Sequence, residues 1–570
     1  MFPLIDQLGN WNPQLLRELK GRIKPSTVVL AIALSGIVQF LLLIYCYGRL
    51  PAPISTLNSH HYCTGKLLHL GEQMCVRDAV GNLLINWQVW WADTFVSLSL
   101  TGSFLLILVG VYLLANDVTQ EEQRGTLNFI RLSPRATWEI LLGKLLGVPV
   151  VLYLGVLLAL PLHIWAALNG QVSIGLMLSF DLVTIAACLF FYSAGLLVNL
   201  ALPKLGGLQV WCSSGVVFIL LMFVYRGAGY AFPGNWLTLL SPTILLGHLD
   251  GSAFAIQSFA DPQHNIRFLW FGFPFLITPL RLLAAFLLHY SVLTAWIWVA
   301  LDRRFRTPSA TLFSKRQSYG LVATLELIAV GFATQATPPY MGSIGSAEPP
   351  QLDYSVVPEL LLNNFYLLML FNLLGLLALA ILLSPARQEL QDWARYRRTQ
   401  SQRAWQSLLQ DLLWAENSPM LLTMAINIGL VMVMMLAWAA SWSDAEYQKR
   451  AILTALLNAG VMLVCMAIAQ VMLNSRLPKR EFWAIGTVSG LIVLPPIAFM
   501  FAFANTSVPQ SMWLFSAIPW VAVETVTAQS LLLTLLGHFS LFGLFSFRLS
   551  QQLRRSGASE TKVLLSGTTP

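Results

Sequence analysis

Long runs of apolar residues alternate with short polar segments along the whole chain. A helix needs about 20 apolar residues to cross the hydrocarbon core of a bilayer, and twelve runs approach or exceed that length. The pattern therefore predicts an all-α fold, a polytopic transmembrane helical bundle of about twelve spans. The predicted spans are residues 28–47, 94–115, 142–166, 179–202, 208–225, 282–301, 320–336, 360–383, 420–441, 451–473, 484–504 and 526–547.

Composition supports a membrane protein and excludes several other classes. Of the 570 residues 56 % are hydrophobic and 11 % are charged, whereas a soluble domain carries roughly 25 % charged residues. A secreted enzyme, a nucleic-acid reader and a disordered scaffold are all excluded by this balance. The net charge of +8 reflects insertion into a membrane and does not indicate a nucleic-acid partner.

The distribution of Lys and Arg predicts the orientation of the spans. With the N-terminus in the cytoplasm, 26 of the 34 Lys and Arg residues fall in inner segments and seven fall in outer segments. Basic residues are concentrated on the cytoplasmic side of membrane proteins. We therefore expect both the N-terminus and the C-terminus to be cytoplasmic.

The first outer loop, residues 48–93, contains two of the six cysteines, Cys63 and Cys75. An oxidising exterior favours a disulfide between them, and two unpaired thiols are the alternative. Three histidines in the same loop match no metal-ligand spacing, so we predict no metal site.

The N-terminal segment, residues 1–27, has the pattern of an amphipathic helix. Asn12 is a favourable N-cap, and Pro13 suits the first helical position. Leu16 and Leu19 fall on one apolar face, with basic residues around the other sides. We interpret the segment as a cytoplasmic interface helix lying in the plane of the membrane surface; an ordinary basic flank of the first span is the alternative.

The second inner segment, residues 116–141, predicts a compact helical projection. Thr119 and Glu122 have the spacing of a capping box, Gly125 bends the chain, and Pro134 ends the helix that follows. A short apolar ridge lies between these breaks and has no core of its own, which favours a binding partner. The ridge and its flanking arginines are Leu127, Phe129, Ile130, Arg124 and Arg131.

Five motifs occur in a characteristic order: Asn12-Pro13, Glu121-Glu122, Arg124-Gly125-Thr126-Leu127, Ser133-Pro134 and Gly143-Lys144. In these motifs residues 10–305 resemble the membrane subunits of type-2 ATP-binding-cassette (ABC) exporters. The resemblance implies a permease whose loop 116–141 couples to a cytoplasmic ATPase. The implied docking residues are Glu121, Glu122, Arg124, Gly125, Thr126, Leu127, Phe129, Ile130, Arg131 and Pro134.

The resemblance also implies where ATP is hydrolysed. The chain contains no Gly-x-x-x-x-Gly-Lys-Ser/Thr loop to hold ATP phosphates, so ATP and Mg²⁺ are expected in a partner ABC ATPase subunit. The chain itself is then a transporter permease without a cofactor, and not an enzyme. Its other expected partners are the lipid bilayer and an exported substrate of unidentified class, in the bacterial cytoplasmic (inner) membrane.

Weak internal symmetry predicts a second, degenerate half. Gly486 and Gly490 repeat the spacing of Gly143 and Gly147, a pattern that permits close helix packing. The working pore is then either a pseudo-dimer within one chain or a homodimer. The expected segments are the interface helix (1–27), a six-span permease half (28–305), a two-span connector (306–383), a cytoplasmic amphipathic helix (384–419), the degenerate permease half (420–550) and a disordered cytoplasmic tail (551–570).

The sequence leaves three functions open. The chain is an exporter subunit, or it is a membrane anchor that binds an ATPase without moving substrate. A proton-coupled secondary transporter is the third candidate, because Glu326 and three histidines fall in or near spans. These histidines are His163, His289 and His538.

Overall fold

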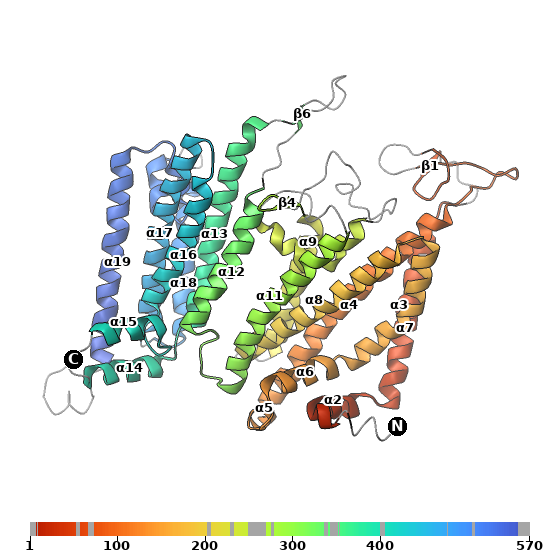
Figure 1. Ribbon diagram of the computed structural model, residues 1–570, viewed down its shortest axis with the longest axis horizontal. Coiled ribbons are helices and arrows are strands. Elements are labelled where there is room, and N and C mark those ends of the chain that lie inside the picture. Colours follow the sequence, from red (N-terminus) through yellow and green to blue (C-terminus); the bar gives the residue numbers. More distant parts are fainter. Residues whose placement is uncertain are drawn as a thin grey trace. The chain divides into compact units, whose positions relative to one another are not determined.

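The computed structural model is almost entirely helical where it describes the chain, with three two-stranded sheets (Figure 1). The chain divides into two compact units, unit 1 with most residues up to Pro308 and unit 2 from Ser309 onward. The structure describes residues 7, 9–52, 58–66, 73–201, 207–227, 233–248, 269–274, 279–335, 340–341, 351–352, 354–399, 405–475, 477–503 and 508–556.

Unit 1 is built around helix α4. This helix packs against α7, α8 and α9, and α8 packs in turn against α11. Its helices are α2 (Pro13–Arg22), α3 (Pro25–Gly48), α4 (Trp87–Gln123), α5 (Thr126–Arg131), α6 (Thr137–Gly147), α7 (Val150–Asn169), α8 (Ile174–Ala201), α9 (Gly207–Gly227), the 3-10 helix η4 (Pro242–His248) and α11 (Pro279–Arg306). Strands β1 (Ser59–His60) and β2 (Gln73–Met74) pair antiparallel, with Ser59 opposite Met74.

Unit 2 is built around helix α17, which packs against α13, α16, α18 and α19. Its helices are α12 (Lys315–Ala333), η5 (Tyr354–Val356), α13 (Val357–Leu383), α14 (Arg387–Thr399), α15 (Trp405–Trp414), α16 (Leu421–Ala440), α17 (Ala445–Leu473), α18 (Arg480–Ala502), η6 (Gln510–Phe515), η7 (Pro519–Ala522) and α19 (Ala528–Ser556). The remaining elements are η3 (Pro233–Leu240) and strands β3 (Leu269–Trp270), β4 (Phe273–Pro274), β5 (Tyr340–Met341) and β6 (Gln351–Leu352).

Ten helices of the described residues are long and apolar enough to cross a membrane, so the chain is a helical multi-pass membrane protein. Eleven of the twelve predicted runs fall mainly within one helix each, but the run 142–166 is divided between α6 and α7, which Val148 and Pro149 separate. The apolar stretch of α9, Gly207–Met222, is shorter than the ten helices that could cross a membrane. Helix α12 has Lys315 and Arg316 in its first turn and Glu326 at its centre. The total of about twelve spans and the cytoplasmic position of the termini stay predictions.

The central helix α4 combines large buried apolar residues with a small residue that permits close packing. Val111 and Leu114 are completely buried. A Cβ atom added at Gly110 would overlap the hydroxyl of Tyr192 on α8, and that hydroxyl donates to the Leu106 carbonyl at 2.7 Å. Gly110 therefore permits α8 to pack closely on α4, with the tyrosine hydroxyl satisfied inside the apolar interior.

The predicted capping box at Thr119 and Glu122 is wrong, because both residues lie inside α4, which continues to Gln123. The Thr119 hydroxyl donates to the Ala115 carbonyl at 2.8 Å and accepts from the side chain of Gln209 at 3.2 Å. A capping box is a local pattern, and here the long span helix overrides it.

The amphipathic helix predicted over residues 384–419 is two helices, α14 and α15. Residues 400–404 between them lie outside the described part. Helix α14 begins two residues after Pro385, as expected of a proline that cannot sit inside a helix. The two helices lie near the end of α19 in Figure 1, and α14 packs against α19.

Candidate functional site

Helices α2, α5 and α6 gather at one end of the long helices of unit 1 (Figure 1), and α2 packs directly on α6. Asn12 caps α2, since its side-chain oxygen accepts from the Leu15 amide at 2.9 Å. The same side chain donates to the Glu139 carbonyl on α6 at 2.7 Å. One asparagine thus both begins α2 and attaches it to α6.

The packing of α2 on α6 requires two glycines of α6. A Cβ atom at Gly143 would lie 2.7 Å from the Asn12 side-chain oxygen, and one at Gly147 would lie 2.5 Å from the Glu18 Cβ. The small-residue pattern therefore does permit close packing, and its partner is α2. For Gly486, among the described residues, an added Cβ would meet nothing within 4 Å, so the matching pattern in unit 2 makes no such contact.

A buried lysine joins three helices beneath this packing. Lys144 of α6 is completely buried. Its ammonium group lies 2.7 Å from the Asp117 carboxylate and 2.7 Å from the Glu121 carboxylate, both on α4. The Glu18 carboxylate of α2 is 3.8 Å away. A buried charge must be paired to be tolerated, and Lys144 has carboxylates on both neighbouring helices.

Two arginines of α2 complete the cluster. Arg17 lies 2.7 Å from Glu121, and Arg22 lies 2.5 Å from Asp117 and 3.2 Å from Glu18. The group therefore contains three carboxylates and three cations. We call it the charge anchor; its members are Arg17, Glu18, Arg22, Asp117, Glu121 and Lys144.

The three carboxylates of the charge anchor have oxygens within 4.8 Å of one another, close enough to hold a metal ion. The Lys144 ammonium already lies between two of them. The lysine supplies the positive charge that a metal ion would otherwise bring. The anchor is therefore best described as a structural ion-pair network.

The projection predicted after Gly125 is helix α5. Gly125 has φ of 74°, a left-handed conformation that glycine adopts readily, and it separates α4 from α5. The predicted apolar ridge is divided between two faces. Leu127 and Ile130 are buried in unit 1, whereas the side chain of Phe129 is 82 % exposed and that of Leu132 is 83 % exposed.

Two hollows flank Phe129. One, of about 580 Å³, lies between α2 and the α5–α6 turn and is lined by Pro13, Leu132 and Pro134 among others. The other, of about 360 Å³, lies beside the end of α4 and is lined by Gln120 and Arg124 among others. Phe129 lines both hollows, so it stands as an exposed aromatic ridge between two recesses.

The remaining predicted docking residues have different environments. Glu121 is buried in the charge anchor and also lines the hollow beside the end of α4. Arg124 is exposed, and Thr126 donates to the Glu121 carbonyl at 3.2 Å. The guanidinium of Arg131 lies 5.8 Å from the Phe305 ring; burial lowers the pKa of Arg131, while the nearby Glu122 carboxylate opposes that shift.

Helix α5 ends at Arg131, before the predicted stop at Pro134. The interface residues Leu16 and Leu19 are half-buried, whereas Leu15 and Glu18 are the buried positions of α2. Sequence reasoning missed the roles of Glu18, Asp117 and Lys144. Lys144 could have indicated this ion-pair cluster, because it is a charged residue inside an otherwise apolar stretch of α6.

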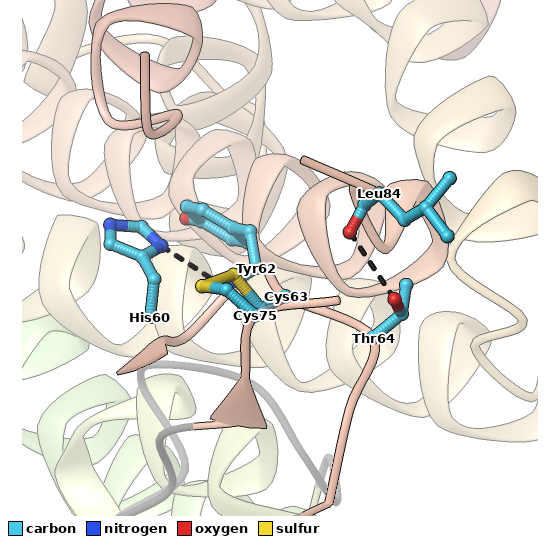
Figure 2. Close-up of a disulfide and its surroundings, with 6 residues drawn as sticks. All are labelled: His60, Tyr62, Cys63, Thr64, Cys75 and Leu84. Atoms are coloured by element: carbon cyan, nitrogen blue, oxygen red, sulfur yellow. Dashed lines mark hydrogen bonds between the residues drawn. A yellow bond between two sulfur atoms is a disulfide. The ribbon is translucent and has the colours of Figure 1, made fainter. Parts of the chain in front are cut away.

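The loop between α3 and α4 contains the disulfide Cys63–Cys75 (Figure 2). The Tyr62 amide beside it donates to His60 Nδ1 at 3.2 Å, and the Tyr62 hydroxyl donates to the Asp93 carboxylate of α4 at 2.8 Å. His61 Nε2 lies 3.3 Å from the same carboxylate. The loop is thus attached to α4 through Tyr62, and His60 and His61 contact neighbouring groups of the protein; His69 lies outside the described residues.

We expect maleimide labelling of the denatured protein to detect four thiols before reduction and six afterwards. The four free cysteines are Cys46, Cys188, Cys212 and Cys465, and the disulfide accounts for the other two. Mass spectrometry of the labelled chain measures both numbers. Six labelled thiols without reductant would contradict the disulfide.

Comparison with known proteins identifies no relative of this chain. No family model, no curated protein and no solved structure matches it. The function is therefore inferred from the residues and their geometry alone.

Proposed function

We propose that the chain is the membrane-spanning subunit of an ATP-driven exporter and that α5 binds a separate cytoplasmic ATPase. The observation that carries the proposal is the exposure of Phe129 on a short helix whose opposite face is buried, and of Leu132 directly after that helix. Exposed aromatic residues are frequent hot spots of protein interfaces. The recesses on either side of Phe129 give a partner surface room to enter.

The connections of α5 support a mechanical role. Only Arg124 and Gly125 separate α5 from α4, and a short turn leads from α5 into α6. The charge anchor joins α4 and α6 to α2. A force applied by an ATPase at α5 therefore reaches the central helix of unit 1 through rigid elements, as a transition between two transport states requires.

Removal of the exposed ring is expected to weaken ATPase binding. Phe129→Ala should lower the affinity for the ATPase by about 30-fold, the typical minimum for a hot-spot aromatic. The measurement is vanadate-sensitive ATP hydrolysis in the fraction that co-purifies with the tagged chain from its own host. Trp138→Ala is the matched control, because Trp138 is also an exposed aromatic but lines neither hollow.

Equal ATPase recovery with Phe129→Ala and with the unaltered chain would contradict the docking role of α5. A second measurement separates an exporter from a membrane anchor. Substrate must stimulate ATP hydrolysis in the reconstituted complex if the chain moves it, and the substrate must accumulate in cells that lack the chain. An anchor binds the ATPase without either effect.

A proton-coupled transporter is the second candidate, favoured by Glu326. This carboxyl group is 3 % exposed within α12 and accepts a hydrogen bond from the Asn372 side chain at 3.1 Å. Buried ionisable residues of membrane helices commonly mark ion or proton paths. Transport by the purified chain in vesicles with a pH gradient and no ATP would favour this function over the exporter.

A further inference from the structure

A groove in unit 2 lies where helix α19 changes from apolar to basic. Helix α19 is one of the ten candidate spans, and its last turns carry Arg548, Arg554 and Arg555, all exposed. Helix α14 packs against it, near the end of α19 in Figure 1. A span that ends in arginines ends at the lipid headgroups, so this groove lies at the membrane–water boundary.

The groove combines apolar and basic walls. It has a volume of about 520 Å³. Trp393 of α14, Leu408 of α15 and Leu553 of α19 provide apolar surface, and the guanidinium groups of Arg397 and Arg554 also line the groove. No carboxylate of the described residues lines it. A ligand that matches these walls is an amphiphile with a negatively charged head.

The wall formed by α14 is held in place by an ion pair. Arg397 and Asp411 are 2.6 Å apart, and Arg397 also donates to the Ser407 hydroxyl at 2.9 Å. The Trp393 indole N–H donates to the Asp411 carboxylate at 3.4 Å. The aspartate thus balances the charge of Arg397 and fixes the tryptophan, so the groove is preformed.

The charge of Arg554 is not balanced within the described residues, since no ion pair there includes it. A guanidinium group at the membrane surface attracts anionic lipids and binds phosphate oxygens through two parallel hydrogen bonds. In the same groove, Trp393 and Leu553 suit the glycerol and upper acyl-chain region of a lipid. The charge and the apolar surface lie together in one groove.

We propose that this groove binds an anionic phospholipid, with Arg554 contacting its headgroup phosphate. The position at the end of a span favours a bilayer lipid over a free anion. The site is independent of the ATPase proposed above, because it lies in unit 2 and uses no residue of α5. Its expected effect is to fix the contact between α14 and α19.

The test is a lipid titration of the full-length protein in detergent, with bound lipids counted by native mass spectrometry. We expect phosphatidylglycerol to bind more tightly than phosphatidylcholine, and millimolar inorganic phosphate not to displace it. Arg554→Gln should weaken phosphatidylglycerol binding about fivefold, the effect of one basic residue near an anionic surface. Binding of phosphatidylcholine should not change.

Arg555→Gln is the matched control, because it removes the same charge one residue further along α19, outside the groove lining. It should retain phosphatidylglycerol binding close to that of the unaltered protein. Three outcomes would overturn the proposal: equal losses in both variants, equal affinity for the two lipids, or displacement of the lipid by phosphate. Both arginines are exposed, so neither substitution prevents folding.

Discussion

Lys144→Met should lower the free energy of unfolding by about 3–5 kcal/mol, the typical cost of removing one partner from a buried ion pair. The substitution leaves the carboxylates of Asp117 and Glu121 without the ammonium group that lies 2.7 Å from each. Methionine has nearly the same length and fills the same space, so the loss is electrostatic. The measurement is chemical or thermal unfolding of the detergent-solubilised protein.

Two further variants make this prediction specific to the charge anchor. Lys20→Met removes a lysine from the exposed side of α2 and should have no measurable effect. Lys144→Met combined with Glu121→Gln also removes one of the two carboxylates that the lysine neutralised, and it should recover part of the lost stability, a non-additivity expected for residues in direct contact. If Lys144→Met and Lys20→Met unfold alike, the charge anchor does not stabilise unit 1.

Local features of the fold could be predicted from the sequence because they depend on a few neighbouring residues. Asn12 and Pro13 begin α2, and Gly125 separates α4 from α5. The apolar runs indicate the positions of the long helices, since a helix that crosses lipid must satisfy its own backbone groups. These features need no knowledge of tertiary contacts.

Features that depend on distant contacts could not be predicted. Glu121 is a predicted docking residue, and the sequence does not reveal that it also pairs with Arg17 and Lys144, which belong to two other helices. Leu127 and Phe129 are two residues apart and equally apolar, and only packing in unit 1 decides that one is buried and the other exposed. The pattern of residue types predicts the projecting helix, but it does not predict which face of that helix is exposed.

The predicted internal symmetry illustrates the same limit. The pairs Gly143/Gly147 and Gly486/Gly490 have identical spacing, yet in the described residues only the first pair lies against another helix. A small residue permits close packing but does not supply the partner. The partner of the first pair is α2, and its position depends on Asn12 and Glu18.

Gly147→Leu should therefore detach α2 from α6. An added Cβ would lie 2.5 Å from the Glu18 Cβ, closer than two carbon atoms can approach, and the leucine side chain adds three more carbons. Because α2 must move away, Glu18 and Arg22 lose their ion pairs with Lys144 and Asp117. The expected result is trypsin cleavage in α2, at Arg17, Lys20 or Arg22, at least tenfold faster than in the unaltered protein.

Gly486→Leu provides the matched control, because open space surrounds that glycine in the described structure. It should leave both the cleavage rate of α2 and the unfolding midpoint unchanged. Lys144→Met removes only a charge, whereas Gly147→Leu fills only the space in which α2 packs. If both variants give their expected results, the attachment of α2 depends on the charge anchor and on close packing together. A Gly147→Leu protein with a protected α2 would mean that this attachment does not depend on close contact with α6.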